Sequence, residues 1–134
     1  MVALDTNLLV RVFLEDKEQP EQTQIARRLV SKTEPLYVSQ IVQVEAVWVL
    51  DTVYQCSKSD IVLMLEQLAE NTPFVLQRAE VFAAALDLYR KHNVDFADCL
   101  ILAESREMNT ELFTFDKRLA KLSGARQVSY SGEH

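Results

Sequence analysis

The chain has 134 residues, which is the size of one ordinary domain, and we expect residues 1–134 to form a single domain. Hydrophobic residues make up 49% of the chain and charged residues 25%, which excludes a disordered chain and a miniprotein held together by disulfides. The formal net charge of -6 excludes nucleic-acid binding through bulk positive charge, so any such role must depend on a local site. With only two glycines, the sequence has no Gly-rich loop for nucleotide phosphates.

No stretch long enough to span a bilayer is free of charged residues. The first residues, Met1 to Asp5, lack the basic segment that precedes the apolar core of a secretory signal. We therefore expect a cytoplasmic protein that does not enter a membrane.

Short apolar runs alternate with helical patterns along the chain. The runs predict strands over residues 2–4, 36–38, 74–76, 112–115 and 127–130. Apolar residues at helical spacing predict helices over residues 8–13, 20–32, 41–50, 61–68, 81–89 and 96–108, and a short helix from 116. Short strands separated by helices require crossover connections, so we predict an α/β fold in which helices flank a central, mostly parallel sheet.

Two acids directly follow predicted strands. Asp5 follows the first strand, and Asp116 follows the strand over residues 112–115. In an open parallel sheet the functional site lies beyond the carboxyl ends of the strands. Both acids also stand where a helix cap is expected, so their position alone leaves a site and a cap equally open.

Two further acids lie among apolar residues on predicted helices. The residues three and four positions from Glu45 are Ile41, Val42, Trp48 and Val49. Asp98 repeats the pattern with Val94, Ile101 and Leu102. We expect both carboxylates to emerge from apolar faces, where an ionised carboxylate needs a partner. A partly exposed side chain near a helix end is the alternative for Glu45.

These four acids are expected to converge at one edge of the sheet. Two unpaired carboxylates ~5 Å apart repel by about 3 kcal/mol at an effective dielectric of ~20, so such a cluster needs a cation. Oxygen ligands without nearby Cys or His favour Mg²⁺ or Mn²⁺ over zinc. A divalent ion held in this way suits phosphodiester hydrolysis, because it activates a bound water and stabilises the leaving oxygen.

Four short motifs carry a resemblance to a known family. They are Leu4-Asp5-Thr6-Asn7-Leu8-Leu9, the helix around Glu45, Asp95-Phe96-Ala97-Asp98 and Thr114-Phe115-Asp116. In this order and spacing the sequence resembles PIN-domain ribonucleases, in particular the VapC toxins of type II toxin–antitoxin pairs. The resemblance covers nearly the whole chain. It implies a PIN-like three-layer sandwich, a Mg²⁺-dependent endoribonuclease that acts on RNA, and a homodimer neutralised by a cognate antitoxin.

Residue by residue, the resemblance assigns metal binding and catalysis to the four acids Asp5, Glu45, Asp98 and Asp116. It assigns supporting hydrogen bonds to Thr6, Asn7 and Thr114. Asp95 is an additional acid that either caps the helix of Asp98 or extends the metal site, and we favour the cap.

An RNA substrate requires positive charge near the acids. The candidates are Arg11, which lies on the helix that follows Asp5, and Lys117 and Arg118, which directly follow Asp116. Ordinary solvated charge on a helix face is the alternative interpretation of each.

Two other functions fit parts of the pattern. The first is a PIN-like module that binds RNA or protein with little or no cleavage, although such a module does not require all four acids. The second is a phospho-acceptor receiver domain with an aspartate at a strand end, which we rank lower because no suitable lysine follows a late strand.

Overall fold

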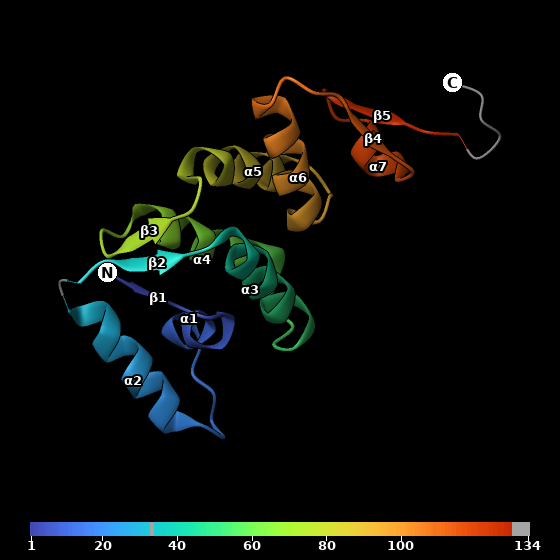
Figure 1. Ribbon diagram of the computed structural model, residues 1–134. Coiled ribbons are helices and arrows are strands. Elements are labelled where there is room, and N and C mark those ends of the chain that lie inside the picture. Colours follow the sequence, from blue (N-terminus) through green and yellow to red (C-terminus); the bar gives the residue numbers. More distant parts are fainter. Residues whose placement is uncertain (33, 130–134) are drawn as a thin grey trace. The chain divides into compact units, whose positions relative to one another are not determined.

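The computed structural model describes residues 1–32 and 34–129, which form two compact units, Met1–Ala79 and Glu80–His134. Each unit is built from short parallel strands and the helices that connect them (Figure 1). The prediction of an α/β fold with parallel strands flanked by helices is confirmed. That residues 1–134 act as one domain stays a prediction. In the described part of the chain, no helix is both long enough and apolar enough to cross a membrane.

The first unit contains a sheet of three parallel strands in the order β1-β2-β3, namely Val2–Ala3, Leu36–Val38 and Phe74–Leu76. Val2 pairs with Leu36, and Leu36 pairs with Phe74, so the three strands run in register. All three carboxyl ends therefore lie at the same edge of this sheet. Four helices connect these strands: α1 (Thr6–Phe13), α2 (Pro20–Ser31), α3 (Gln40–Thr52) and α4 (Lys58–Glu70).

Local sequence explains where these helices begin. The side chains of Asp5, Ser39 and Ser57 each accept a hydrogen bond from the first turn of α1, α3 and α4, respectively. A side-chain acceptor at this position satisfies a backbone N–H that has no partner inside the helix. Helix α2 begins instead at Pro20, whose fixed backbone angle suits the first helical position.

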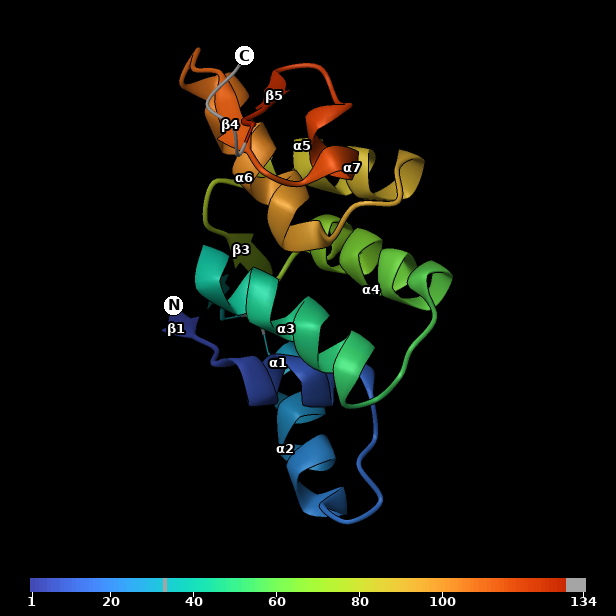
Figure 2. The same ribbon diagram turned by 90° about the vertical axis from the view of Figure 1, so that its right-hand side faces the viewer.

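The second unit contains α5 (Ala79–Lys91), α6 (Phe96–Glu107), β4 (Leu112–Thr114), α7 (Lys117–Ala120) and β5 (Ala125–Gln127). Strands β4 and β5 pair in parallel, with α7 between them in the chain (Figure 2). The rings of Phe82 and Tyr89 both meet Phe96 edge to face, with centroids 5.8 and 5.7 Å apart, and fix α5 on α6.

Several element boundaries differ from the sequence prediction by one to three residues, and the last two strands show why. Strand β4 ends at Thr114, one residue early, because Asp116 already serves as the cap of α7. Strand β5 covers Ala125–Gln127 and not residues 127–130, because its register is set by pairing with β4. Tyr130, the last residue of the predicted strand, lies outside the described residues.

Candidate functional site

Asp5 lies at the carboxyl end of the first strand and caps helix α1. One of its carboxylate oxygens, Oδ1, accepts a hydrogen bond of 2.9 Å from the backbone N–H of Leu8. The side chain is exposed, and its Oδ2 oxygen has no protein partner among the residues that the structure describes. The sequence left a cap and a functional site open, and the geometry allows both, because the cap uses only one oxygen.

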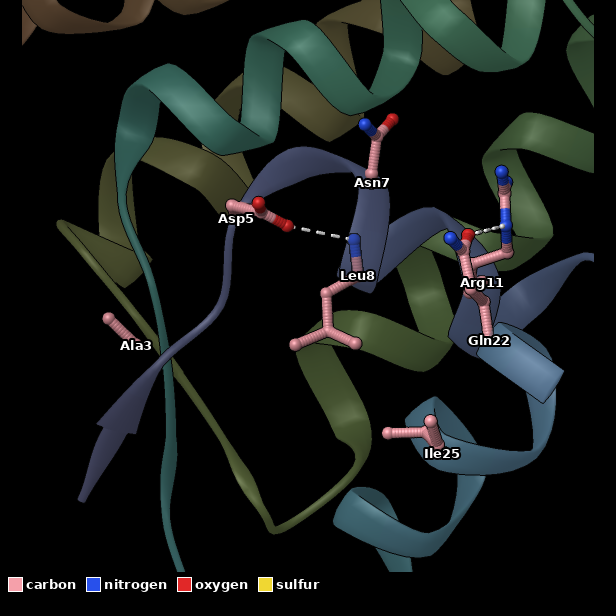
Figure 3. Close-up of a pocket in the computed structure, with 7 residues that line it drawn as sticks. All are labelled: Ala3, Asp5, Asn7, Leu8, Arg11, Gln22 and Ile25. Carbon is pink, nitrogen blue, oxygen red and sulfur yellow. Dashed lines mark hydrogen bonds between the residues drawn. The ribbon is translucent and has the colours of Figure 1, made fainter. Parts of the chain in front are cut away.

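An open hollow of about 550 Å³ lies beside Asp5, and Figure 3 shows its lining. Ala3, Leu8 and Ile25 form the apolar part of the lining, and Asp5, Asn7, Arg11 and Gln22 form the polar part. Asn7 is exposed and lines the same hollow as Asp5 (Figure 3).

Glu45 lies on α3 and accepts a hydrogen bond from a residue of helix α1. The hydroxyl of Thr6 donates a hydrogen bond of 3.0 Å to Oε1 of Glu45. Because Thr6 directly follows Asp5, this bond brings the elements that carry the two acids together. Thr6 therefore supports a candidate ligand by a direct contact, in the manner of the outer partners that orient metal ligands.

Glu45 emerges from an apolar face as predicted, but the expectation that this face is buried is wrong. Glu45 is exposed, and its neighbours on the same side of the helix, Ile41 and Trp48, are 72% and 62% exposed. Helix α3 is apolar nearly all round, so its sequence does not reveal which side is packed. The packed side consists of Val42, Gln43, Ala46, Val47 and Leu50.

Asp98 lies in the first turn of α6 and is partly buried. Burial raises its pKa above the ordinary range, and the negative charges of Asp95 and Asp116 raise it further. The second unit therefore brings three of the acids named from the sequence within electrostatic reach of one another.

Asp95 occupies the N-cap position of α6, but its side chain makes no capping hydrogen bond. The sequence correctly predicted that Asp95 stands at the N-cap position, but the prediction that its carboxylate caps the helix is wrong. The charge of Asp95 acts instead on Asp98.

Asp116 caps the four-residue helix α7. Its Oδ1 accepts a hydrogen bond of 2.9 Å from the N–H of Leu119. The N–H of Asp116 in turn donates to the hydroxyl of Thr114 at 3.0 Å. Thr114 thus fixes the backbone of Asp116. The carboxylate is exposed, and only its Oδ1 oxygen takes part in the cap.

The three basic candidates differ in their surroundings. The Arg11 side chain is only 12% exposed, and its guanidinium forms an ion pair of 3.0 Å with Asp16. It also donates to Gln22 at 3.3 Å and to the hydroxyl of Tyr54. Lys117 and Arg118 are exposed, and among the described residues neither forms an ion pair. Only the latter two side chains have their charge available to a ligand without breaking an internal contact.

The candidate ligands suit a hard divalent cation in kind. They are carboxylate oxygens, which Mg²⁺ and Mn²⁺ prefer. The pKa of Asp98 is raised by burial and then by the negative charges of Asp95 and Asp116, which a cation would offset. Within the described ranges no group of three His, Cys, Asp or Glu side chains has the geometry of a metal site. Asp5 and Glu45 belong to the first unit, and Asp98 and Asp116 belong to the second.

Sequence reasoning missed two polar residues around these acids. Gln43 is fully buried on the packed side of α3, and Tyr54 binds both Arg11 and Asp16. A glutamine inside an otherwise apolar helical stretch was the available signal for Gln43. No local pattern indicates the role of Tyr54, because its partners lie far away in the sequence.

Comparison with known proteins agrees with the four motifs. The PIN domain family model matches residues 2–125, and the chain belongs to this family. The chain is similar to a protein named VapC ribonuclease from Aquifex aeolicus (strain VF5), with 30% identity over 125 residues. The match covers 91% of this chain and 92% of that protein. The resemblance recognised from the four motifs is thereby confirmed.

Proposed function

We propose that the protein is a metal-dependent endoribonuclease that hydrolyses RNA phosphodiester bonds and serves as the toxin of a type II toxin–antitoxin pair. Membership of the PIN domain family and similarity to a protein named VapC ribonuclease support this proposal. The observation that carries it is that the four acids keep carboxylate oxygens available for a ligand. Each has a carboxylate oxygen beyond those used in internal hydrogen bonds, and Asp98 sits in an excess of negative charge.

In this proposal Asp5, Glu45, Asp98 and Asp116 hold Mg²⁺, for which Mn²⁺ can substitute. The metal supplies an activated water and stabilises charge on the leaving oxygen. Thr6 fixes the Glu45 carboxylate by its hydrogen bond, and Thr114 fixes the backbone of Asp116. Asn7 supports Asp5 from the rim of the hollow. Asp95 adds negative charge beside Asp98 and so strengthens the demand for a cation.

Phosphate contacts are assigned to Lys117 and Arg118, which are exposed and directly follow an acid of the site. Arg11 was a third candidate from the sequence. Its contacts with Asp16, Gln22 and Tyr54 support a structural role at the corner between α1 and α2, so we place it behind the other two.

A toxin of this class needs a partner that silences it in the cytoplasm. Large apolar side chains on α2 and α3, namely Ile25, Ile41 and Trp48, are more than half exposed, as expected of surfaces used for dimerisation or for antitoxin binding. The carboxylates would also attract an Arg or Lys side chain of an antitoxin, since charge-assisted bonds of this kind are strong. A homodimer and a cognate antitoxin therefore belong to the proposal.

The test is cleavage of a mixed pool of structured RNAs with Mg²⁺ or Mn²⁺, compared with EDTA. The variant Asp5→Asn removes one charge and keeps an oxygen that can cap α1. The matched control is Asp51→Asn, which makes the same change at an exposed site near the end of α3. We expect metal-dependent cuts by the wild type and by Asp51→Asn, and none by Asp5→Asn.

Equal activity of Asp5→Asn and the wild type would contradict the proposal. Metal-independent RNA binding without any cleavage would favour the alternative, a PIN-like module that binds RNA or protein.

A further inference from the structure

Gln43 is a buried amide that joins helix α3 to the sheet of the first unit. It is 0% exposed, and its Nε2 donates to the backbone carbonyls of Val38 at 3.3 Å and Gln77 at 3.1 Å. Val38 is the last residue of β2, and Gln77 directly follows β3. One side chain therefore connects α3 to the carboxyl ends of two neighbouring strands.

A second connection fixes the same end of α3. The backbone N–H of Gln40, the first residue of the helix, donates to the side-chain Oε1 of Gln77 at 2.9 Å. Ser39 caps the helix at Val42. Directional hydrogen bonds at the first turns determine both the position of a helix along its axis and its rotation about that axis.

Burial of the Gln43 amide has a cost that an apolar side chain would avoid. Its Oε1 oxygen is buried and has no hydrogen-bond partner among the residues that the structure describes. A small cavity that Gln43 helps to line is otherwise lined by apolar side chains such as Leu9, Leu65 and Leu68. A buried polar atom without a partner costs free energy, and an apolar side chain would suit these surroundings better. What only the amide provides is the pair of directional bonds to the strand ends.

We propose that Gln43 is a positioning residue for Glu45, an inference that rests on the proposed function. The two residues are two positions apart, so their side chains leave the helix about 200° apart. Gln43 faces the strand ends, and Glu45 is exposed on another side, where it accepts the hydrogen bond from Thr6. The amide thus fixes the helix rotation at which the Glu45 carboxylate meets Thr6, the residue next to Asp5.

The test removes the amide and preserves its size. Gln43→Met keeps an unbranched side chain of similar length and loses both hydrogen bonds, while the carbonyl of Val38 keeps its bond from the N–H of Gln77. Gln67→Met is the matched control, because Gln67 is exposed on α4. Urea unfolding first establishes that each variant is folded, and Gln43→Leu replaces Gln43→Met if the latter does not fold.

Mn²⁺ affinity is then measured by calorimetry in a double-mutant cycle with Glu45→Gln. We expect Gln43→Met to weaken Mn²⁺ binding about tenfold, the lower end of the range for residues that orient metal ligands. In the Glu45→Gln background the same change should have no further effect, because the ligand that Gln43 positions is already removed. An equal loss in both backgrounds, or no loss at all, would overturn the proposal.

An NMR comparison without metal separates this inference from the proposed function. In Gln43→Met the side-chain carboxyl resonance of Glu45 and the amide resonance of Thr6 should shift, and in Gln67→Met they should not. Unchanged resonances in Gln43→Met would overturn the positioning role. A wild type that binds no Mn²⁺ would count against the proposed metal site. The Glu45 and Thr6 resonances would still test whether Gln43 positions Glu45, because they are measured without metal.

Discussion

We propose that Asp5 is both a helix cap and a metal ligand, and substitution can separate the two roles. As a cap it offers Oδ1 to the N–H of Leu8 at 2.9 Å, and as a ligand it offers negative charge. Asparagine is as good a cap as aspartate but has no charge, whereas alanine is neither cap nor ligand. Asp5→Ala should therefore lower the free energy of unfolding by about 1 kcal/mol, and Asp5→Asn by only a few tenths.

For a domain of this size, a loss of about 1 kcal/mol corresponds to a decrease in Tm of about 4 °C. Thermal unfolding in EDTA should thus distinguish the two variants, while both should lose Mn²⁺ binding in calorimetry. Ser57→Ala is the control, because it removes the cap of α4, where Ser57 accepts from Asp60 at 3.2 Å, and touches none of the four acids. It should lose stability and keep metal binding. The reasoning is refuted if Asp5→Asn binds Mn²⁺ as the wild type does, or if it unfolds together with Asp5→Ala.

Three further predictions concern the acids and the basic residues. Because the folded state raises the pKa of Asp98, the metal-free protein should lose stability as the pH rises from the ordinary carboxyl range through this raised value. Asp98→Asn should be less sensitive to pH and more stable than the wild type at neutral pH. The measurement is urea unfolding with EDTA between pH 4 and 8, and the same dependence of unfolding free energy on pH in both proteins would contradict the prediction. Thr6→Val should weaken Mn²⁺ binding about tenfold by releasing Glu45, and unchanged calorimetry would count against that role. Lys117→Ala should reduce the slope of log RNA affinity against log salt concentration by about one unit. Arg11→Ala should leave this slope unchanged and lower the free energy of unfolding by about 1–3 kcal/mol, because it removes the ion pair with Asp16. The reverse result would mean that Arg11, and not Lys117, contacts phosphate.

Features that depend on neighbours in the chain were predictable from the sequence. The caps formed by Asp5, Ser39 and Asp116 follow from a polar residue placed before an apolar helical pattern. Strands β2 and β3 have the predicted bounds, because each is a short apolar run that follows a proline. The order of these elements was enough to predict a parallel α/β fold.

Features that depend on tertiary contacts were not predictable in the same way. The apolar sequence of α3 does not say which side is packed, so the exposure of Glu45 was mispredicted. The ion pair of Arg11 with Asp16 depends on how the chain turns between α1 and α2. The carboxylate of Asp95 stands at a cap position and makes no cap, because residue type and position do not determine where a side chain points.

The central proposal is that four acids, Asp5, Glu45, Asp98 and Asp116, serve one metal-dependent reaction. It is tested most directly by Mn²⁺ titration of four single variants, Asp5→Asn, Glu45→Gln, Asp98→Asn and Asp116→Asn, beside the wild type and Asp51→Asn. We expect weaker Mn²⁺ binding in each of the four variants and unchanged binding in Asp51→Asn. If any of the four substitutions leaves Mn²⁺ binding unchanged, that acid does not hold the metal and the proposal of a four-acid site is contradicted.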